Sequence, residues 1–399
     1  MKYVIFLGDG MADEPQDALG GLTILEKAHT PNMDMIAREG ACGLLSTVPD
    51  GLPPDSTVAN LSVMGYDPRE CLEGRGVLEA AAMGVEIGPD DHAMRMNLIS
   101  VTEGMIRTHS GGNITTAEAA ELVKALQEQL RYDGVEYHSG VSYRHVMKLT
   151  CPASKAIRCM PPHDHLDEPL EDHLPTAAAP EGEETAALLR EIVLKSNDIL
   201  ENHPVNQARA KRGEQMANYC WPWSIGRRPK MKTFAELFGV SGGVISAVDL
   251  IRGIGVYAGM AAPTVEGATG LWNTNYENKA DAALKVLEDH DLVYIHLEGP
   301  DEAGHEGSLE LKLRAIEDLD RRLISRVMQG LVREPARFAV LPDHYTPIRI
   351  RTHVANPVPF AIMGTGIAPD SVQTYSEKSC ASGALGQLAG DEFMRRFIG

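Results

Sequence analysis

The chain has 399 residues, of which 43% are hydrophobic, and 56 acidic against 37 basic side chains give it a net charge of −19. This length allows two domains with a large core, and the acidic excess argues against nucleic acid and anionic membrane surfaces as partners. No stretch approaches the roughly 18 continuous apolar residues of a membrane span, whereas a small anionic substrate is compatible if arginines gather locally.

The first 71 residues are predicted to alternate strands and helices. The apolar run Lys2–Leu7 predicts a buried strand that ends just before Asp9 and its flanking glycines. A helix is expected over residues 30–38, with a proline in its first turn, and a second strand over residues 41–48. Another helix should begin at Ser56, because apolar residues follow it at helical spacing.

The start of the chain and its cysteines indicate the compartment. The N-terminus runs straight into the first strand and lacks the basic start, apolar stretch and cleavage site of a signal peptide. The six cysteines are scattered and form no CxxC pair. We therefore expect a cytoplasmic protein with free thiols.

The middle of the chain, residues 72–175, differs in character and is interpreted as a smaller α/β domain inserted into the first. An amphipathic helix is predicted over residues 115–130. The proline- and acid-rich stretch 161–182 is expected to be a linker or a long surface loop. Strands are predicted over residues 96–101, 135–138 and 145–150.

The remaining residues, 176–399, are expected to complete the first domain, which is thus discontinuous (1–71 and 176–399). Strands are predicted over residues 244–248, 292–297, 338–341 and 359–363, and helices over 185–201, 278–290, 308–329 and 382–397. This alternation predicts an α/β fold whose mainly parallel sheet carries helices on both faces. In such sheets ligands bind beyond the carboxyl ends of the strands.

Carboxylates and imidazoles adjoin these predicted strands and form a candidate metal site. Asp301 and His305 are spaced so that one helical turn presents both on one face. The adjacent pair Asp343 and His344 follows a strand. The two further candidates are Asp9 and His353. Taken singly, each is equally well a capping, turn or loop residue.

The donor atoms of this set indicate the kind of ion. They are oxygen and imidazole nitrogen without a thiolate, which suits Mn²⁺, Zn²⁺, Mg²⁺ or Co²⁺. Ser56 is the candidate nucleophile, since a metal ion and a helix N-terminus both stabilise an alkoxide and an attached phosphate. Its plainer interpretation is an N-cap, and Thr57 is a weaker alternative.

These motifs resemble a known family over nearly the whole chain. MKYVIFLGDGMAD, HTPNMDMIAREG, VANLSVMGYDP, GVSYRH, VISAVDLIRGIG, PDEAGHEG, PDH and the THxxxPVPF pattern occur in family order. The chain thereby resembles the archaeal-type, cofactor-independent (2,3-bisphosphoglycerate-independent) phosphoglycerate mutases of the alkaline phosphatase superfamily. The resemblance implies an alkaline-phosphatase-like fold and a glycolytic isomerase that interconverts 3-phosphoglycerate and 2-phosphoglycerate.

The resemblance also implies roles for particular residues. Two divalent ions are expected, with Mn²⁺ as the first candidate, and Ser56 would become phosphorylated. Where the family often has SAGH, this chain has Ser110-Gly111-Gly112-Asn113, so a substrate-contacting imidazole is either missing or supplied by His109. One ion would be held by Asp301, His305 and His353, and the other by Asp9, Asp343, His344 and Ser56.

In this mechanism the inserted domain would close as a lid that excludes water and supplies cationic groups. Arginine binds carboxylate and phosphate through its planar fork. The candidate substrate ligands are Arg144 and Arg209, together with Asn206 and His163.

Two related activities remain open. A metal-dependent phosphatase would share the same residues but release inorganic phosphate. A homoserine-kinase-like phosphotransferase would need ATP, although the chain has neither a GxxxxGK[ST] loop nor a kinase signature. A sulfatase is disfavoured because no CxPxR-like sequence is present.

Overall fold

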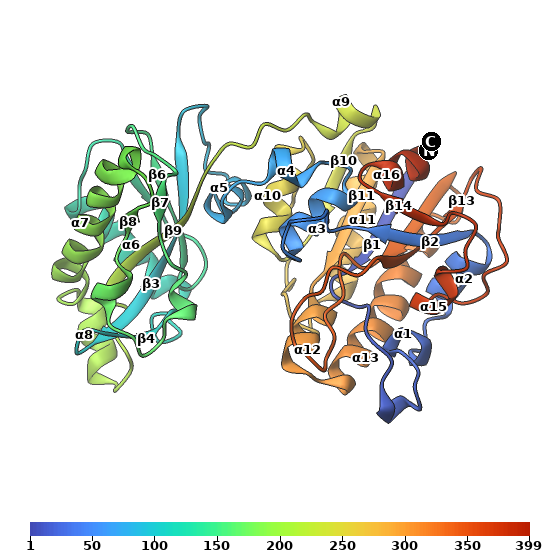
Figure 1. Ribbon diagram of the computed structural model, residues 1–399, viewed down its shortest axis with the longest axis horizontal. Helices are drawn as coiled ribbons and strands as arrows, with labels where there is room; N and C mark the ends of the chain where they lie inside the picture. Colours follow the sequence, from blue (N-terminus) through green and yellow to red (C-terminus); the bar gives the residue numbers. More distant parts are fainter. The chain divides into compact units, whose positions relative to one another are not determined.

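The computed structural model describes all 399 residues, which form two compact units (Figure 1). Unit 1 comprises Met1–Leu72 and Lys230–Gly399, and unit 2 comprises Glu73–Pro229. The insert was predicted over residues 72–175, whereas the second compact unit runs on to Pro229. Strand β9 (Tyr219–Arg227) pairs with β3 (His92–Thr102) and so adds the later segment to unit 2.

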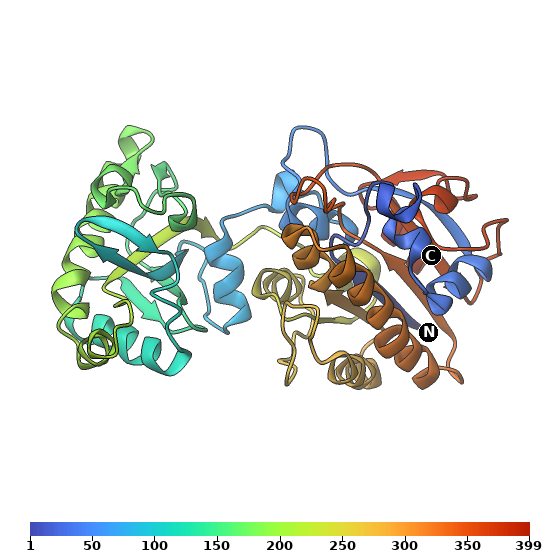
Figure 2. The ribbon, with the colours of Figure 1, turned by 90° about the horizontal axis from the view of Figure 1, so that it is seen from below.

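Unit 1 is built on a seven-stranded sheet with the order β10-β11-β1-β12-β13-β2-β14. Figure 2 shows this unit from a second direction, with helices lying along the sheet. Adjacent strands are parallel except that β13 runs antiparallel to both β12 and β2. The predicted mainly parallel sheet is therefore confirmed. The strands are β1 (Lys2–Gly8), β2 (Ala41–Ser46), β10 (Gly242–Ile245), β11 (Leu292–Leu297), β12 (Ala336–Leu341), β13 (Val358–Gly364) and β14 (Gln387–Ala389).

Both faces of this sheet are covered, as the side chains of β1 demonstrate. Successive side chains of a strand point to opposite faces. Val4 and Phe6 belong to one apolar cluster with residues of α2 (Pro31–Arg38) and α11 (Tyr276–Asp289). Tyr3 points to the other face, where its ring contacts Phe397 of α16 (Glu392–Ile398) at 5.7 Å between centroids.

The other helices of unit 1 lie between the strands along the chain. The predicted helix 308–329 is present but interrupted by a π-helical segment, Leu319–Ile324. Besides α2, α11 and α16, the helices of unit 1 are α1 (Ile24–Lys27), α3 (Ser56–Val63), α4 (Pro68–Cys71), α9 (Phe234–Phe238), α10 (Asp249–Tyr257), α12 (Gly299–Glu306), α13 (Leu309–Asp318), α14 (Ser325–Gly330) and α15 (Glu377–Cys380).

The predicted helix 382–397 is wrong over its first half. Strand β14 occupies part of that segment, and only α16 is helical. Gly386 and Gly390 adopt φ values of 64° and 56°. These left-handed conformations are incompatible with a continuous right-handed helix.

Unit 2 contains a five-stranded antiparallel sheet in which β3 pairs with β4, β6 and β9, and β6 also pairs with β5. The predicted loop 161–182 belongs to this unit and includes short 3₁₀ turns and β8. The further strands are β4 (Met105–Thr108), β5 (Val135–His138), β6 (Arg144–Leu149), β7 (Ile157–Arg158) and β8 (Thr176–Ala177). The helices are α5 (Arg75–Ala82), α6 (Thr116–Gln129), α7 (Glu183–Leu200) and α8 (Pro204–Lys211).

The core of unit 2 lies between this sheet and two of its helices. Leu122 and Leu126 of α6, and Leu189 and Ile192 of α7, pack with apolar residues of the sheet such as Met96. None of the helices in either unit combines the length and the apolar character required to cross a membrane.

Candidate active site

The acidic and imidazole residues predicted from the sequence converge at the carboxyl ends of three neighbouring strands in unit 1. Asp9 directly follows β1, and Asp343 and His344 follow β12. Asp301 and His305 lie on α12, which follows β11. Because β1 lies between β11 and β12 and all three are parallel, their carboxyl ends meet at one edge of the sheet.

Ser56 reaches this edge from the start of α3. Its hydroxyl oxygen lies 3.2 Å from Nε2 of His344. The capping role that the sequence left open for Ser56 belongs to Asp55, whose carboxylate accepts a hydrogen bond from the Thr57 amide at 2.8 Å. The Ser56 hydroxyl is thus not used as a cap and faces the imidazole.

Two imidazoles of the site are oriented by backbone carbonyl groups. His305 Nδ1 lies 3.0 Å from the Arg351 oxygen, and His353 Nδ1 lies 3.1 Å from the Pro54 oxygen. A carbonyl oxygen only accepts, so each Nδ1 carries the proton and donates it. The Nε2 atoms then face the site, in the arrangement by which proteins orient histidine ligands of metals.

His344 is oriented by a side-chain relay. The hydroxyl of Thr346 donates to Asp301 and lies 3.2 Å from His344 Nδ1, which therefore donates to it. Around the same carboxylate, His305 Nε2 and His353 Nε2 lie 3.2 and 3.4 Å from oxygens of Asp301. The Asp301 contact raises the pKa of His305 to about 9, which indicates that this group of atoms favours a positive charge.

A second group of donor atoms surrounds Asp9. Its Oδ2 lies 2.9 Å from Nε2 of His296, while its buried Oδ1 has no hydrogen-bond partner. Asp343 accepts hydrogen bonds from the amide of Gly10 and the side chain of Asn60. Burial and then repulsion from Asp343 raise the pKa of Asp9. A bound cation would reverse this effect by stabilising the ionised carboxylates.

His296 and Glu298 belong to the site but were missed in the sequence. Burial lowers the pKa of His296 to about 3, so the ring is neutral and is able to serve as a ligand. Burial and then the charge of Asp301 raise the pKa of Glu298 to about 8, and its Oε2 has no hydrogen-bond partner. A histidine inside the otherwise apolar strand β11 was the available signal.

The donor atoms form two groups that fit divalent cations. In each group they lie within 4.8 Å of one another, and they combine imidazole nitrogen with carboxylate oxygen. The structure brings together all seven residues proposed from the sequence, but it adds His296 and places His344 beside both groups. The groups are Asp301, His344 and His353, and Asp9, His296 and Asp343.

Two of the four proposed substrate ligands have structural roles in unit 2. The Arg209 side chain is only 3% exposed and pairs with Glu118 at 2.9 Å, and it also donates to the carbonyl groups of Gly111 and Gly112. The Asn206 side chain is buried and binds backbone groups through both its oxygen and its nitrogen. Their polar groups are engaged within the fold, so the predicted substrate contact does not fit them.

The other two proposed ligands, Arg144 and His163, lie near further basic side chains of unit 2. The His163 ring contacts the rings of Trp223 and His109, with centroids 5.6 and 5.9 Å apart. The Arg95 guanidinium lies 5.0 Å from the Trp223 centroid. Burial lowers the pKa of Arg95, and the nearby positive charge of Arg144 lowers it further. We call Arg95, His109, Arg144 and His163 the basic cluster. Burial lowers the pKa of both histidines, so at neutral pH they are hydrogen-bonding groups without charge.

Comparison with known sequences gives consistent matches. Residues 37–206 match the sequence model of a family described as 2,3-bisphosphoglycerate-independent phosphoglycerate mutase. Proteins of that name from Methanosarcina acetivorans and Methanothrix thermoacetophila are 46% and 47% identical to this chain, and each alignment covers 100% of both sequences. A probable mutase of the same kind from Geobacter sulfurreducens is 47% identical, with 96% of each chain covered.

Solved structures share the fold. The PH0037 protein from Pyrococcus horikoshii matches with a TM-score of 0.84 and 30% identity, over 100% of this chain and 96% of that one. A cofactor-independent phosphoglycerate mutase from Thermoplasma acidophilum matches with a TM-score of 0.70 and 27% identity, over 100% and 99%. The likeness therefore extends over both units.

Proposed function

The chain belongs to the family of 2,3-bisphosphoglycerate-independent phosphoglycerate mutases, and on that premise we propose that it interconverts 3-phosphoglycerate and 2-phosphoglycerate. The single observation that carries the proposal is the position of Ser56. Its hydroxyl lies at the first residue of α3, 3.2 Å from His344 and beside two groups of metal-type donors.

The donor groups would hold two divalent ions. Mn²⁺ is the first candidate, and Zn²⁺, Mg²⁺ and Co²⁺ suit the same oxygen and nitrogen donors. When bound, such ions lower the pKa of a coordinated hydroxyl and stabilise charge on phosphoryl oxygens. We assign Asp301, His305 and His353 to one ion, and Asp9, Asp343, His344 and Ser56, joined by His296, to the other.

Ser56 would act as the nucleophile in two opposite transfers. Its hydroxyl would lose a proton and form a bond to phosphorus while the bond between phosphorus and the glycerate oxygen breaks. The released glycerate oxygen would then take up a proton. The other glycerate hydroxyl then attacks the phosphoserine and regenerates Ser56. The N-terminus of α3 favours the negative phosphoryl group, because its amide dipoles point toward Ser56.

The mutase also needs groups that retain the glycerate between the two transfers. We propose that Arg144 and His163, with His109 of the basic cluster, bind the carboxylate or phosphate of the substrate, whereas Arg95 pairs with Glu79 at 2.8 Å and supports the cluster from within the fold. Arginine supplies charge and paired donors to such anions, and a neutral imidazole supplies a further hydrogen bond. His109 thus takes the place of the family imidazole that the sequence SGGN lacks.

The six unpaired cysteines support a reducing compartment, which we take to be the cytoplasm.

One assay with three readouts tests this function. The purified chain with Mn²⁺ and 3-phosphoglycerate, without bisphosphoglycerate, should form 2-phosphoglycerate, which added enolase converts to a product that absorbs ultraviolet light. Release of inorganic phosphate at a comparable rate would instead identify a phosphatase. Turnover that requires ATP and homoserine would identify a phosphotransferase.

A further inference from the structure

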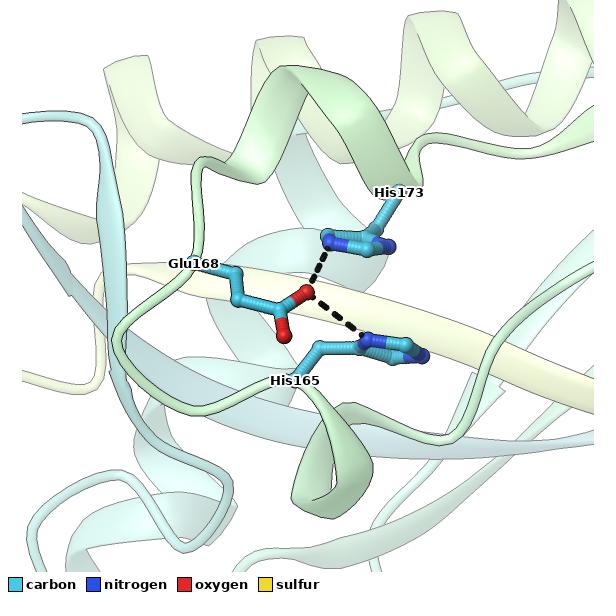
Figure 3. Close-up of side chains that lie close together, drawn as sticks. All are labelled: His165, Glu168 and His173. Atoms are coloured by element: carbon cyan, nitrogen blue, oxygen red, sulfur yellow. Dashed lines mark hydrogen bonds and ion pairs between the residues drawn. The ribbon is translucent and has the colours of Figure 1, made fainter.

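A third group of ligand-type side chains lies in unit 2, in the segment that joins β7 to β8 (Figure 3). It consists of His165, Glu168 and His173. None of the three belongs to the basic cluster, although His165 follows His163 by only two positions, and none has a part in the proposed phosphoryl transfer. The proline- and acid-rich composition of this segment gave no indication that three such side chains would converge.

One carboxylate oxygen lies between two imidazole nitrogens. Glu168 Oε2 is 3.0 Å from His165 Nδ1 and 2.6 Å from His173 Nε2. The two rings stack with their centroids 3.9 Å apart and an angle of 24° between their planes. The far nitrogen of the His165 ring is buried and has no hydrogen-bond partner. The polar interaction of this ring is therefore directed at Glu168.

The backbone on both sides of Glu168 is fixed to strand β4. The Ile106 amide donates to the Glu168 carbonyl at 3.0 Å, and the Asp167 amide donates to the Ile106 carbonyl at 2.8 Å. The next turn is held by a hydrogen bond from the Leu170 amide to the Gly104 carbonyl at 2.8 Å, and the Leu170 side chain is buried. A site whose supporting backbone is fixed in this way is preorganised for a ligand.

We propose that His165, Glu168 and His173 bind a divalent transition-metal ion, for which Zn²⁺ is the first candidate. Donor atoms about 3.3 Å apart are expected around a tetrahedral zinc ion with bonds of about 2.0–2.1 Å. The observed distances from Glu168 Oε2 to the two imidazole nitrogens are 3.0 and 2.6 Å, so each would have to lengthen by less than an ångström to admit the ion. Two imidazoles with one carboxylate favour Zn²⁺ and Co²⁺ over Mg²⁺ and Ca²⁺, which prefer all-oxygen surroundings.

The exposure of these three side chains allows an ion to enter and allows water to complete its coordination. The Glu168 side chain is 49% exposed, whereas the side chains of His165 and His173 are 17% and 15% exposed. Three protein ligands with an accessible fourth position are typical of open zinc sites. Since His163 of the basic cluster lies only two residues before His165, an ion here would also stiffen the segment that carries a proposed substrate ligand.

The direct test is the number of zinc ions that the full-length protein binds. Equilibrium dialysis against Zn²⁺ in excess Mg²⁺, followed by elemental analysis, should give one ion fewer per chain for Glu168→Gln than for the wild type. His173→Gln should lose the same single ion. The matched control is His138→Gln, since His138 pairs with Glu136 at 3.1 Å in the same unit but has no third ligand. This control should retain the wild-type number.

Two further measurements keep the test independent of folding and of the ions in unit 1. The Co²⁺ absorption of the wild type minus that of Glu168→Gln should contain visible bands of a four-coordinate site, because contributions from unit 1 cancel. Circular dichroism should show that Glu168→Gln, a change at a half-exposed side chain, remains folded. Equal zinc content in wild type and folded Glu168→Gln would overturn the proposal and leave a hydrogen-bonded cluster. Equally tight competition by Mg²⁺ would overturn the assignment to transition metals.

Discussion

Asn60 connects the helix of the candidate nucleophile to a carboxylate of the candidate metal site, because its side-chain amide donates to Asp343 at 2.8 Å. The same nitrogen donates to the Ser56 carbonyl, also at 2.8 Å. The Asn60 oxygen accepts a hydrogen bond from the hydroxyl of buried Tyr294 at 2.6 Å, which fixes the orientation of the amide. Asn60 is thus a positioning residue for both Ser56 and Asp343.

Replacing Asn60 by alanine should lower kcat and metal affinity, because the Asp343 carboxylate loses the donor that orients it. Loss of such an outer partner costs on the order of 10- to 100-fold in metal affinity or activity. Mn²⁺ titration and enolase-coupled kinetics measure the two effects. Asn278→Ala is the control, since that side-chain amide donates to the Glu266 carbonyl and not to a residue of the candidate metal site. Unchanged Mn²⁺ affinity and kcat in Asn60→Ala would contradict the positioning role.

Replacing Ser56 by alanine should abolish the mutase reaction, because its hydroxyl is the one that faces His344 Nε2, whereas the Thr346 hydroxyl is engaged with Nδ1. We expect a loss in kcat of at least about 10³-fold, as for other enzymes that lose a covalent nucleophile. Mass spectrometry of the acid-quenched wild type should find phosphate on Ser56. Ser62→Ala provides the comparison on the same helix, since its hydroxyl donates only to the Val58 carbonyl. Substantial mutase activity in Ser56→Ala would exclude the phosphoserine route.

Arg144 and Arg209 should respond differently to truncation. Arg144→Ala should raise the KM for 3-phosphoglycerate about tenfold or more and leave stability nearly unchanged, because a charged contact to the substrate is lost. Arg209→Ala should lower the free energy of unfolding by about 2 kcal/mol, since it breaks a partly buried ion pair and leaves two carbonyl groups unpaired. Kinetics and thermal unfolding distinguish the two. The reverse assignment of effects would show that Arg209 binds the substrate after all.

Chelation should inactivate the protein and destabilise unit 1. Without cations, Asp9 and Asp343 are buried carboxylates that repel each other. Binding at one hundred times the dissociation constant stabilises a fold by about 2.7 kcal/mol. The Tm should therefore fall after dialysis with a chelator and recover, together with activity, on addition of Mn²⁺. Asp301→Asn should show a smaller recovery, and a Tm insensitive to chelation in the wild type would contradict the metal site.

Glu377 should make stability depend on pH, outside the catalytic groups. Burial raises its pKa to about 7 in the folded chain, although hydrogen bonds from Thr23 and the Asp13 amide oppose this effect. The unfolded pKa is about 4.3, so between these values the folded state binds more protons and stability falls as pH rises. The free energy of unfolding of the wild type relative to Glu377→Gln should drop by about 3 kcal/mol from about pH 4.3 to 7. It should stay level above pH 7, and a level difference throughout would contradict the shift.

The sequence predicted the sheet well because its signals are local. Strand β11 begins and ends where its apolar run does, at Leu292 and Leu297. The helix expected at 382–397 failed because β14 forms by pairing with β2, more than 340 residues earlier in the chain. Such pairing leaves no trace in the periodicity of the segment itself.

The residues of the site were predictable to the extent that they lie next to strand ends. Asp9 and Asp343 have this property, whereas His296 lies inside a strand and was passed over. The partners of Arg209 that make it structural, Gly111 and Gly112, lie nearly 100 residues away in the sequence. Their role emerges only when the fold brings the two segments together.

The reversed direction of β13 has a consequence for His353. Because β13 runs opposite to the other strands, it begins at the edge of the sheet where they end. His353 precedes β13 in the chain and therefore lies near residues that follow the other strands, such as Asp9 and Asp343. The ladder that pairs Phe338 with Met363 and Val340 with Ala361 therefore sets how far the imidazole reaches. Slippage by one residue would displace it by about 3.3 Å, which is longer than any bond between a histidine and a metal.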